Sequence, residues 1–549
     1  MQLVAYGAQD VYLTGSAQIT FFKVIYRRHT NFSVEPIPQT FTGSSDFGRT
    51  VTCTINRNGD LITNMYVNVS LNAVTADSAY TWGYVRRLGF AIVSHYKIEI
   101  GGSKIDEQYG DWLNIWYELS HKVGQERGFS KMIGDVDELT QINNTSDKPA
   151  YQLYVPLQLW FNRNNGLALP LIALQYHDVR LTIDFRSAAQ CVNSVGGGPD
   201  TIKMKDAQLI IDYIYLDSEE RKRFAQASHE YLIEQLQFTG QESLTGSNQK
   251  YRLNFNHPCK YLIWAPHLDK YLNTQYVAYS ASASGWEAAR ERAAKLLWVA
   301  TRAGIVVSDE DGSVKISNSS ESGEVTDFLA SESFLPDSAG TFNIANLVSA
   351  QLIQTTFANT SDDIVVNLDN IVILSNNLTM EHLSIAASDI LYALTSASDL
   401  GTDGAIGETY LANHSVTVTD WFNYGNFLDG TDNPVYAAKL QLNGSDRFQE
   451  RDGFYFNYVQ PYQHFSNTPA DGINVYSFAL KPEDHQPSGT CNFSRIDNAT
   501  LNVKFGLRNE SSSTYTGDYL GSSSNINIYA VNYNVLRVMS GMAGAAYSN

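Results

Sequence analysis

The sequence predicts an all-β protein built from two tandem copies of one antiparallel β domain. Three observations lead to this prediction: apolar and polar residues alternate along many short segments, several segments recur in the same order, and the chain is too long for one domain. Its 549 residues exceed the ~250–300 residues at which a single hydrophobic core stops growing. A hydrophobic content of 43% with only 17% charged residues is typical of a chain that folds around large cores.

Alternation of apolar and polar residues marks the expected strands. The segments 51–55 and 65–71 show it in the first half of the chain, and 179–185 and 501–505 show it again. Because successive side chains of a strand point to opposite faces of a sheet, each of these segments would bury one face and expose the other. Antiparallel sheets of half-buried strands are therefore expected along most of the chain.

An internal duplication is indicated by recurring residues. Four residues of the first half match four of the second half at one constant separation: Leu181, Ile183, Phe185 and Tyr213 correspond to Leu501, Val503, Phe505 and Tyr533. Upstream, KIEIGGS from Lys97 resembles KLQLNGS from Lys439, and Phe-Thr-Gly at 41–43 recurs at 238–240. Matches that keep both order and strand phase predict two copies of one domain, at 41–216 and 237–540.

The remaining segments connect and extend the two copies. Asp217 is the expected N-cap of a linker helix in the segment 217–236. Matching strands lie much farther apart in the second copy than in the first, which predicts an inserted surface subdomain at about 270–412. Residues 1–40 are expected to form an N-terminal arm, and 541–549 a C-terminal tail.

Composition argues against several functions. The net charge of −19 is unfavourable for wrapping nucleic acid, so no direct genome binding is expected. The four cysteines form no Cys-X-X-Cys pair, which argues against a zinc site or a disulfide scaffold. The first residues lack the basic and apolar parts of a signal peptide, and no segment reaches the ~18 apolar residues of a membrane span. Synthesis in the cytosol is expected.

Motifs for catalysis or metal binding are incomplete. The glycine-rich segment from Gly240 lacks the Gly-Lys pair of a phosphate-binding loop. His229 and Glu230 begin a zinc-protease-like motif, but Ile233 stands where the second histidine is required. Asp309 lies in a segment that lacks the carboxylates that open and close a calcium loop. We expect no catalytic, cofactor or metal site, and hence no enzyme.

Two groups of residues leave alternatives open. Arg27, Arg28 and His29 form the sharpest basic cluster, which could contact a polyanion or fix the arm to acidic residues of its own or a neighbouring subunit. Four Asn-X-Ser/Thr sites within or beside the insertion are candidate glycosylation acceptors: Asn318, Asn359, Asn377 and Asn413. A composition rich in asparagine and serine would also generate such sites without modification.

Several long strings resemble one known family. They are QLVAYGAQDVYLTG near the start, FFKVIYRRHTNFS from Phe21, LQLNGSDRF from Leu440, FNYVQPYQHF from Phe456 and GINVYSFALKPEDHQPSGTCNFSRIDNATL from Gly472. These strings resemble the major capsid proteins of nucleocytoplasmic large DNA viruses, as in phycodnaviruses, iridoviruses and mimivirus relatives. The resemblance covers roughly 1–266 and 415–540, while the middle of the insertion matches nothing in the family.

The resemblance implies a structural protein of the virion. It implies two eight-stranded jelly rolls side by side, with short helices, and three chains in a pseudo-hexagonal capsomer of an icosahedral shell around double-stranded DNA. Its partners would be the other chains of a homotrimer, neighbouring capsomers, and minor capsid and penton proteins, with the inner face near an internal viral membrane. Production and assembly in the host cytoplasm follow from the same resemblance.

The resemblance also assigns roles to particular residues. The arm, from residue 1 to about 39, would run along the inner face, which makes Arg27, Arg28 and His29 interface residues. A signature turn would comprise four residues, Asn443, Gly444, Asp446 and Arg447, and Asn-Gly favours a type I′ turn. The insertion would form the outward surface of the capsomer.

A different class of function remains as the alternative. A carbohydrate-binding jelly roll would use aromatic platforms, often beside a pair of carboxylates in a cleft. Four tryptophans could supply such platforms: Trp264, Trp286, Trp298 and Trp421. Tryptophan is at least as often found in cores and subunit contacts, so the capsid interpretation is preferred and carbohydrate binding is kept as the alternative.

Overall fold

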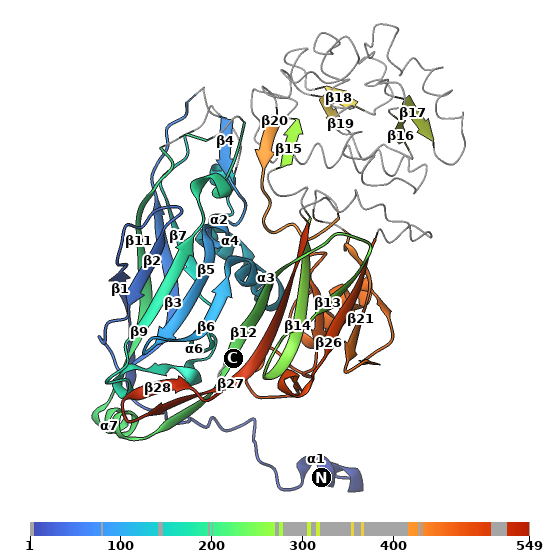
Figure 1. Ribbon diagram of the computed structural model, residues 1–549. Helices are drawn as coiled ribbons and strands as arrows, with labels where there is room; N and C mark the ends of the chain where they lie inside the picture. The colour runs from blue at the N-terminus through green and yellow to red at the C-terminus, as the bar shows by residue number, and fades with distance from the viewer. Residues whose placement is uncertain are drawn as a thin grey trace.

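Two β domains lie side by side in the computed structural model (Figure 1). The structure describes residues 5–77, 81–140, 147–195, 198–199, 201–268, 274–277, 305–308, 315–318, 353–355, 364–366, 415–426, 430, 432–506 and 524–547. All strand pairs among these residues are antiparallel. The predicted all-β architecture is confirmed.

The first domain consists of two sheets that enclose one core. One sheet has the order β1 (Phe32–Thr40), β11 (Met204–Leu216), β3 (Leu61–Leu71) and β7 (Tyr151–Pro156), with β8 (Leu169–Pro170) also paired to β3. The other has the order β2 (Thr50–Thr54), β9 (Val179–Phe185), β5 (Val93–Ile100) and β6 (Ser103–Tyr109). Alternate residues of both sheets, such as Val67 and Leu181, are buried between them.

The second domain repeats this arrangement. Its first sheet has the order β12 (His229–Ser243), β27 (Asn525–Met539), β14 (Pro258–His267) and β24 (Asn474–Ser477), with β25 (Cys491–Asn492) and β28 (Met542–Ala545) attached. Its second sheet has the order β13 (Asn248–Arg252), β26 (Ala499–Phe505), β21 (Val435–Leu442) and β22 (Ser445–Asp446), with β23 (Arg451–Asp452) attached. Because the strands follow the same order in both domains, the fold is a double jelly roll.

Strand register tests the proposed duplication residue by residue. Lys97 lies opposite Thr182 in the first jelly roll, and Lys439 lies opposite Asn502 in the second, as the matched segments require. The match of Tyr213 with Tyr533 is wrong by one residue. Tyr213 faces the core of the first jelly roll. Val531, which lies two residues before Tyr533 and therefore has the same strand phase, faces away from the core of the second jelly roll. The duplication therefore holds in strand order but shifts in phase along β27.

Short helices connect the strands. Those before the second domain are η1 (Ala8–Asp10), α1 (Val11–Thr14), α2 (Leu88–Ile92), α3 (Gly110–Ser120), α4 (Glu126–Ile133), α5 (Asp137–Thr140), α6 (Trp160–Arg163), η2 (Asn165–Leu167), η3 (Leu171–Ala173), η4 (Ala188–Cys191) and α7 (Ser218–Gln226). The second domain adds the π-helical turn η8 (Tyr455–Val459), α13 (Gln460–His464) and η9 (Phe493–Arg495).

Two segment boundaries differ from those expected. Residues 32–40 form β1 of the first sheet, so the part of the arm outside the sheets ends near residue 31. The linker helix is α7, where the side chain of Asp217 accepts hydrogen bonds from the N–H groups of Glu219 and Glu220, and β12 already begins at His229. The expected tail likewise contributes β28, which pairs with β27.

Among the described residues, eight short strands lie near or within the expected insertion or join it to the first jelly roll. A four-stranded sheet has the order β15 (Thr274–Val277), β20 (Ser415–Val418), β10 (Val192–Val195) and β4 (Thr81–Tyr84). Two further pairs are β16 (Ile305–Ser308) with β17 (Lys315–Asn318), and β18 (Ile353–Thr355) with β19 (Ile364–Val366). The first of these sheets links both ends of the insertion to strands of the first jelly roll.

The same two-residue turn occurs in both jelly rolls. Asn443 and Gly444 connect β21 to β22, and both have positive φ angles, 49° and 82°. Gly101 and Gly102 connect β5 to β6 with φ angles of 59° and 83°. Positive φ at both central residues is the type I′ geometry that suits a tight hairpin.

Replacement of Gly444 by valine should destabilise the protein by roughly 1–2 kcal/mol, because a β-branched residue is strained at positive φ. A decrease in melting temperature would report this loss. The control is Gly128→Ala in α4, where an added Cβ meets no atom within 4 Å and alanine favours the helix. An equal decrease for both variants would contradict the assignment of strain to the turn.

Candidate functional site at the junction of the two jelly rolls

The two jelly rolls are joined by a buried junction that contains both apolar and polar groups. Helix α3 of the first jelly roll lies against the β12–β27–β14 sheet of the second (Figure 1). Trp112, Ile115 and Leu119 of α3 pack there with Ile263 and Val531. One face of the β12–β27–β14 sheet therefore packs on the core of the second jelly roll. The opposite face of this sheet is covered by the first jelly roll.

Asp111 is the polar centre of this junction. Its carboxylate accepts hydrogen bonds from the hydroxyl groups of Tyr424 (2.6 Å) and Tyr529 (2.7 Å) and from Asn527 Nδ2 (3.1 Å). His267 Nε2 lies 3.3 Å from the same carboxylate. All four partners belong to the second jelly roll, so this one side chain ties the two jelly rolls together.

The charge of Asp111 is stabilised despite its burial. Desolvation alone would raise the pKa of this carboxyl group, but the neighbouring His267 and the hydrogen bonds from the tyrosines outweigh it and lower the pKa to about 2. Asp111 is also in the first turn of α3, where a negative charge is favourable. The carboxylate is therefore ionised at neutral pH.

Local packing explains why α3 starts where it does. A Cβ atom on Gly110 would lie 2.2 Å from the carbonyl oxygen of Val93 and 2.3 Å from that of Phe90. Only glycine allows the helix to begin this close to β5. The close approach places Asp111 at the edge of the first jelly roll, where the second can reach it.

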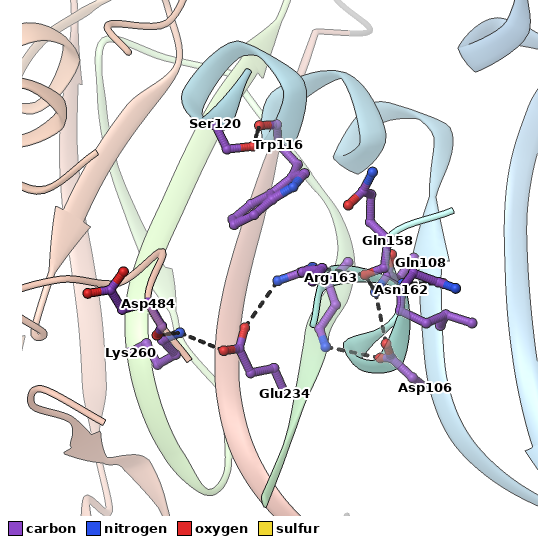
Figure 2. A network of polar contacts seen from close by, with 12 residues as sticks. Asp106, Gln108, Trp116, Ser120, Gln158, Asn162, Arg163, Glu234, Lys260 and Asp484 are labelled. Carbon is purple, nitrogen blue, oxygen red and sulfur yellow. Dashed lines mark hydrogen bonds and ion pairs between the residues drawn. The ribbon is translucent and has the colours of Figure 1, made fainter. Parts of the chain in front are cut away.

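A second polar network lies at the other side of the junction (Figure 2). Glu234 of β12 lies between Lys260 Nζ, at 2.7 Å, and Arg163 NH1, at 3.1 Å. Arg163 belongs to the first jelly roll, and its guanidinium group lies 4.2 Å from the ring centre of Trp116. Burial lowers the pKa of Lys260, whose side chain is fully enclosed, while Glu234 opposes that effect.

Asp106 of β6 supplies a third connection. One of its oxygens accepts the N–H of Leu236 on β12 at 3.0 Å, and the other accepts Gln108 Nε2 at 2.9 Å. The side-chain amide of Gln235 on β12 donates to the carbonyl oxygen of Ile105, which precedes Asp106 on β6. Because β12 is the edge strand of its sheet, β6 covers part of an edge that would otherwise expose unpaired backbone groups.

The junction is suited to hold two domains together. No group of three or more metal-ligating side chains occurs among the residues that the structure describes. None of the helices within these residues reaches the length and hydropathy that a membrane crossing requires. The buried charges are instead paired across the junction, an arrangement that fixes geometry.

The predicted basic cluster lies apart from the junction. Arg27, Arg28 and His29 are exposed on the N-terminal arm, and neither arginine forms an ion pair with any described residue. His29 Nδ1 lies 2.7 Å from the carbonyl oxygen of Thr30. Their role as contact residues stays a prediction.

The predicted signature turn is anchored by hydrogen bonds. Asn443 Oδ1 accepts the N–H groups of Asp497 (3.0 Å) and Asn498 (3.1 Å), which fixes the turn to the chain before β26. Asp446 accepts a hydrogen bond from Gln441 Nε2 at 2.6 Å, and this bond lowers the pKa of Asp446. The backbone N–H of Arg447 donates to Leu440 O at 2.8 Å.

Most of the remaining predicted residues lie outside the part of the chain that the structure describes. Asn359, Asn377 and Asn413 lie outside the described residues, as do the side chain of Asn318 and the whole of Trp286 and Trp298. Trp264 is enclosed in the second core and cannot serve as a sugar platform. Trp421 is half-buried beneath the guanidinium group of Arg186, 4.3 Å from its ring centre.

The junction residues were not predicted from the sequence, although a signal was present. Asp111 interrupts an otherwise apolar helix face, and Lys260 interrupts the apolar segment that becomes β14. A charged residue within an apolar segment is rarely left buried without a partner. Such interruptions could have pointed to a buried polar junction, but not to the partners.

Replacement of Asp111 by alanine should reduce the free energy of unfolding by roughly 3–5 kcal/mol, because it leaves buried donors of the second jelly roll unsatisfied. Calorimetry would show this as a lower melting temperature. Asp178→Ala is the matched control, since that side chain is 63% exposed and forms a surface ion pair with Arg57 worth at most about 1 kcal/mol. Equal effects of the two substitutions would contradict the role given to Asp111.

Asp106 should make the stability depend on pH in the opposite sense to an ordinary salt-bridged carboxylate. Burial raises its pKa from 3.8 to about 6, so the folded protein holds a proton that the unfolded chain loses. As the pH rises from 4 to 7, the free energy of unfolding of the wild-type protein should therefore fall relative to that of Asp106→Asn, by on the order of 1–3 kcal/mol. A difference in melting temperature that stays constant over this range would refute the assignment.

Comparison with known proteins places this architecture in a family. The model described as "Major capsid protein N-terminus" matches residues 20–217, and the model described as "Large eukaryotic DNA virus major capsid protein" matches residues 220–326 and 375–544. Together these two matches cover both jelly rolls.

Full-length relatives agree with this assignment. The chain is 43% identical to "Capsid protein 1" of Acanthamoeba polyphaga mimivirus and 42% identical to the major capsid protein of Phaeocystis pouchetii virus. Each comparison covers 100% of this chain and 99% of the relative. The major capsid protein of Paramecium bursaria Chlorella virus 1 is 36% identical over the same shares.

Solved structures show the same fold. A quasi-atomic model of the PBCV-1 virus capsid superposes with a TM-score of 0.58 at 32% identity, covering 96% of this chain and 100% of that one. The Faustovirus major capsid protein, at 12% identity and a TM-score of 0.56, shares the fold. The relatives are structural proteins of virus shells, not enzymes. This chain therefore belongs to the major capsid proteins of large eukaryotic DNA viruses.

Proposed function

We propose that three copies of this chain form a pseudo-hexagonal capsomer, and that such capsomers tile the faces of an icosahedral shell. The observation that carries the proposal is the repeated jelly roll: both halves of the chain have the same strand order and are locked side by side by Asp111 and its partners. Three such chains around a threefold axis would place six similar β units in a ring. Closed rotational symmetry limits each assembly to a discrete brick.

The N-terminal arm is proposed to lie on the inner face of the shell. Figure 1 shows the arm at the end of the molecule opposite β15 and β20. Many large apolar side chains of the arm are exposed, namely Tyr12, Leu13, Ile19, Phe21, Phe22, Val24, Ile25 and Tyr26. Apolar surface on this scale marks a binding site. Its partners would be minor capsid proteins above an internal membrane, with Arg27, Arg28 and His29 among the contact residues.

The opposite end of the molecule is proposed to face outward. The insertion departs from the sheet that contains β15 and β20, so it would crown the capsomer and could carry glycans at Asn318, Asn359, Asn377 or Asn413. Neighbouring capsomers and penton proteins would contact the sides. Assembly in the host cytoplasm, without direct binding to the genome, is consistent with the net charge of −19.

The solution mass of the purified protein should correspond to three chains. One chain has a mass of 61.1 kDa, so light scattering coupled to size exclusion should give three times that value, about 183 kDa. Electron microscopy of that fraction should show a pseudo-hexagonal outline. A stable folded monomer at micromolar concentration would contradict the capsomer and favour an isolated binding module.

A further inference from the structure

Each jelly roll places a helix at the same point of its topology. Helix α3 follows β6 in the first jelly roll, and η8 with α13 follows β23 in the second. Leu113 of α3 and Phe456 of η8 are the residues that enter the core of their own jelly roll. Aligning these two residues places Tyr462 at the position of Leu119.

The two equivalent positions have opposite environments. Leu119 is fully buried, because α3 packs on the second jelly roll. Tyr462 is 83% exposed, and Leu480 is 73% exposed. His464 at the end of α13 connects this helix to the segment that contains Leu480, since its Nδ1 lies 3.0 Å from Leu480 O. The second jelly roll thus presents two large apolar side chains, Tyr462 of α13 and Leu480, that no described residue of the chain covers.

The surface that would receive such a helix is also repeated. In the second jelly roll, α3 packs on the outer face of the β12–β27–β14 sheet, next to Leu236. In the first jelly roll, Leu209 and Ile211 of β11 face the core, so Ile210 between them faces outward. Val34 lies on the same outer face and is 51% exposed. Part of this outer face is therefore open at Val34, although Ile214 opposite Val34 is buried against Leu61 and Ala168.

We infer that Tyr462 and Leu480 of one copy pack on the outer face of the β1–β11–β3 sheet of a second copy. Figure 1 shows β1 and β11 on the side of the first jelly roll that faces away from the second, so one chain cannot make this contact with itself. The inference rests on the proposed trimer, and it names the two surfaces that meet. The contact joins unlike surfaces, and such a contact closes into a ring of three when each copy is rotated by a third of a turn, as in the proposed trimer.

Two prolines distinguish this contact from the junction within the chain. On β12, the N–H of Leu236 donates to Asp106 of the first jelly roll. On β1, Pro36 and Pro38 have no N–H to donate, and proline in a paired strand occurs where its nitrogen faces away from the neighbouring strand. We therefore expect the contact between copies to depend mainly on side-chain packing. The same prolines prevent β1 from pairing with other strand edges.

Substitution of the helix surface tests the inference. The double variant Tyr462→Asp with Leu480→Asp, and separately Val34→Asp on the receiving face, should raise the concentration at which trimers dissociate by ~10-fold or more. Tyr176→Asp is the matched control, because Tyr176 is also a tyrosine at 75% exposure but lies beside Gly541, on neither surface. Light scattering over a dilution series measures dissociation, and an unchanged melting temperature of diluted monomers shows that folding is intact.

Disulfide trapping provides a second readout. Chains carrying Tyr462→Cys and chains carrying Val34→Cys should form a disulfide-linked dimer when co-expressed and oxidised, whereas neither variant alone should do so. If the wild-type protein is not a trimer, the proposed function fails. If it is a trimer but the charged variants dissociate no more readily than Tyr176→Asp and no mixed disulfide forms, only this docking surface is refuted.

Discussion

The carboxylate of Asp111 is buried in the first jelly roll but finds its hydrogen-bond donors in the second. A desolvated charge is tolerated only where its partners are in place, so the two jelly rolls have one stable arrangement. Glu234, held between Lys260 and Arg163, adds a second constraint on the same arrangement. Two domains that would otherwise move independently therefore behave as one building block, as tiling a shell requires.

The contacts within the chain and those proposed between chains differ in chemistry. The internal junction combines packed aromatic side chains with buried, paired charges, which makes its geometry specific. The proposed external contact is apolar at Tyr462 and faces a strand whose exposed edge carries prolines. If the contact between chains relied on buried charges, these charges would lack their partners in a free monomer and would destabilise it. An exposed tyrosine has no such effect. The chain can thus fold alone and assemble afterwards.

Several features of this structure could be predicted from the sequence because they are local. Alternation located β2, β9 and β26, and Asp217 caps α7 as its position suggested. Errors arose where a local rule was ambiguous. Two prolines made β1 look unlike a strand, so it was assigned to the expected arm. Because side chains of a strand alternate between two faces, a shift of one residue changes the face, and this error led to the wrong match for Tyr533. The partners of Asp111 come from three separate segments, so no local pattern could assemble them.

The central claim is that the two jelly rolls of each chain form one rigid unit that repeats around a threefold axis. An electron cryo-microscopy map of the purified protein tests it most directly. The account predicts six jelly rolls in a ring, with each pair in the relative orientation set by the Asp111 junction. A map in which the two jelly rolls of a chain adopt several relative orientations, or in which Asp111 is exposed to solvent, would contradict it.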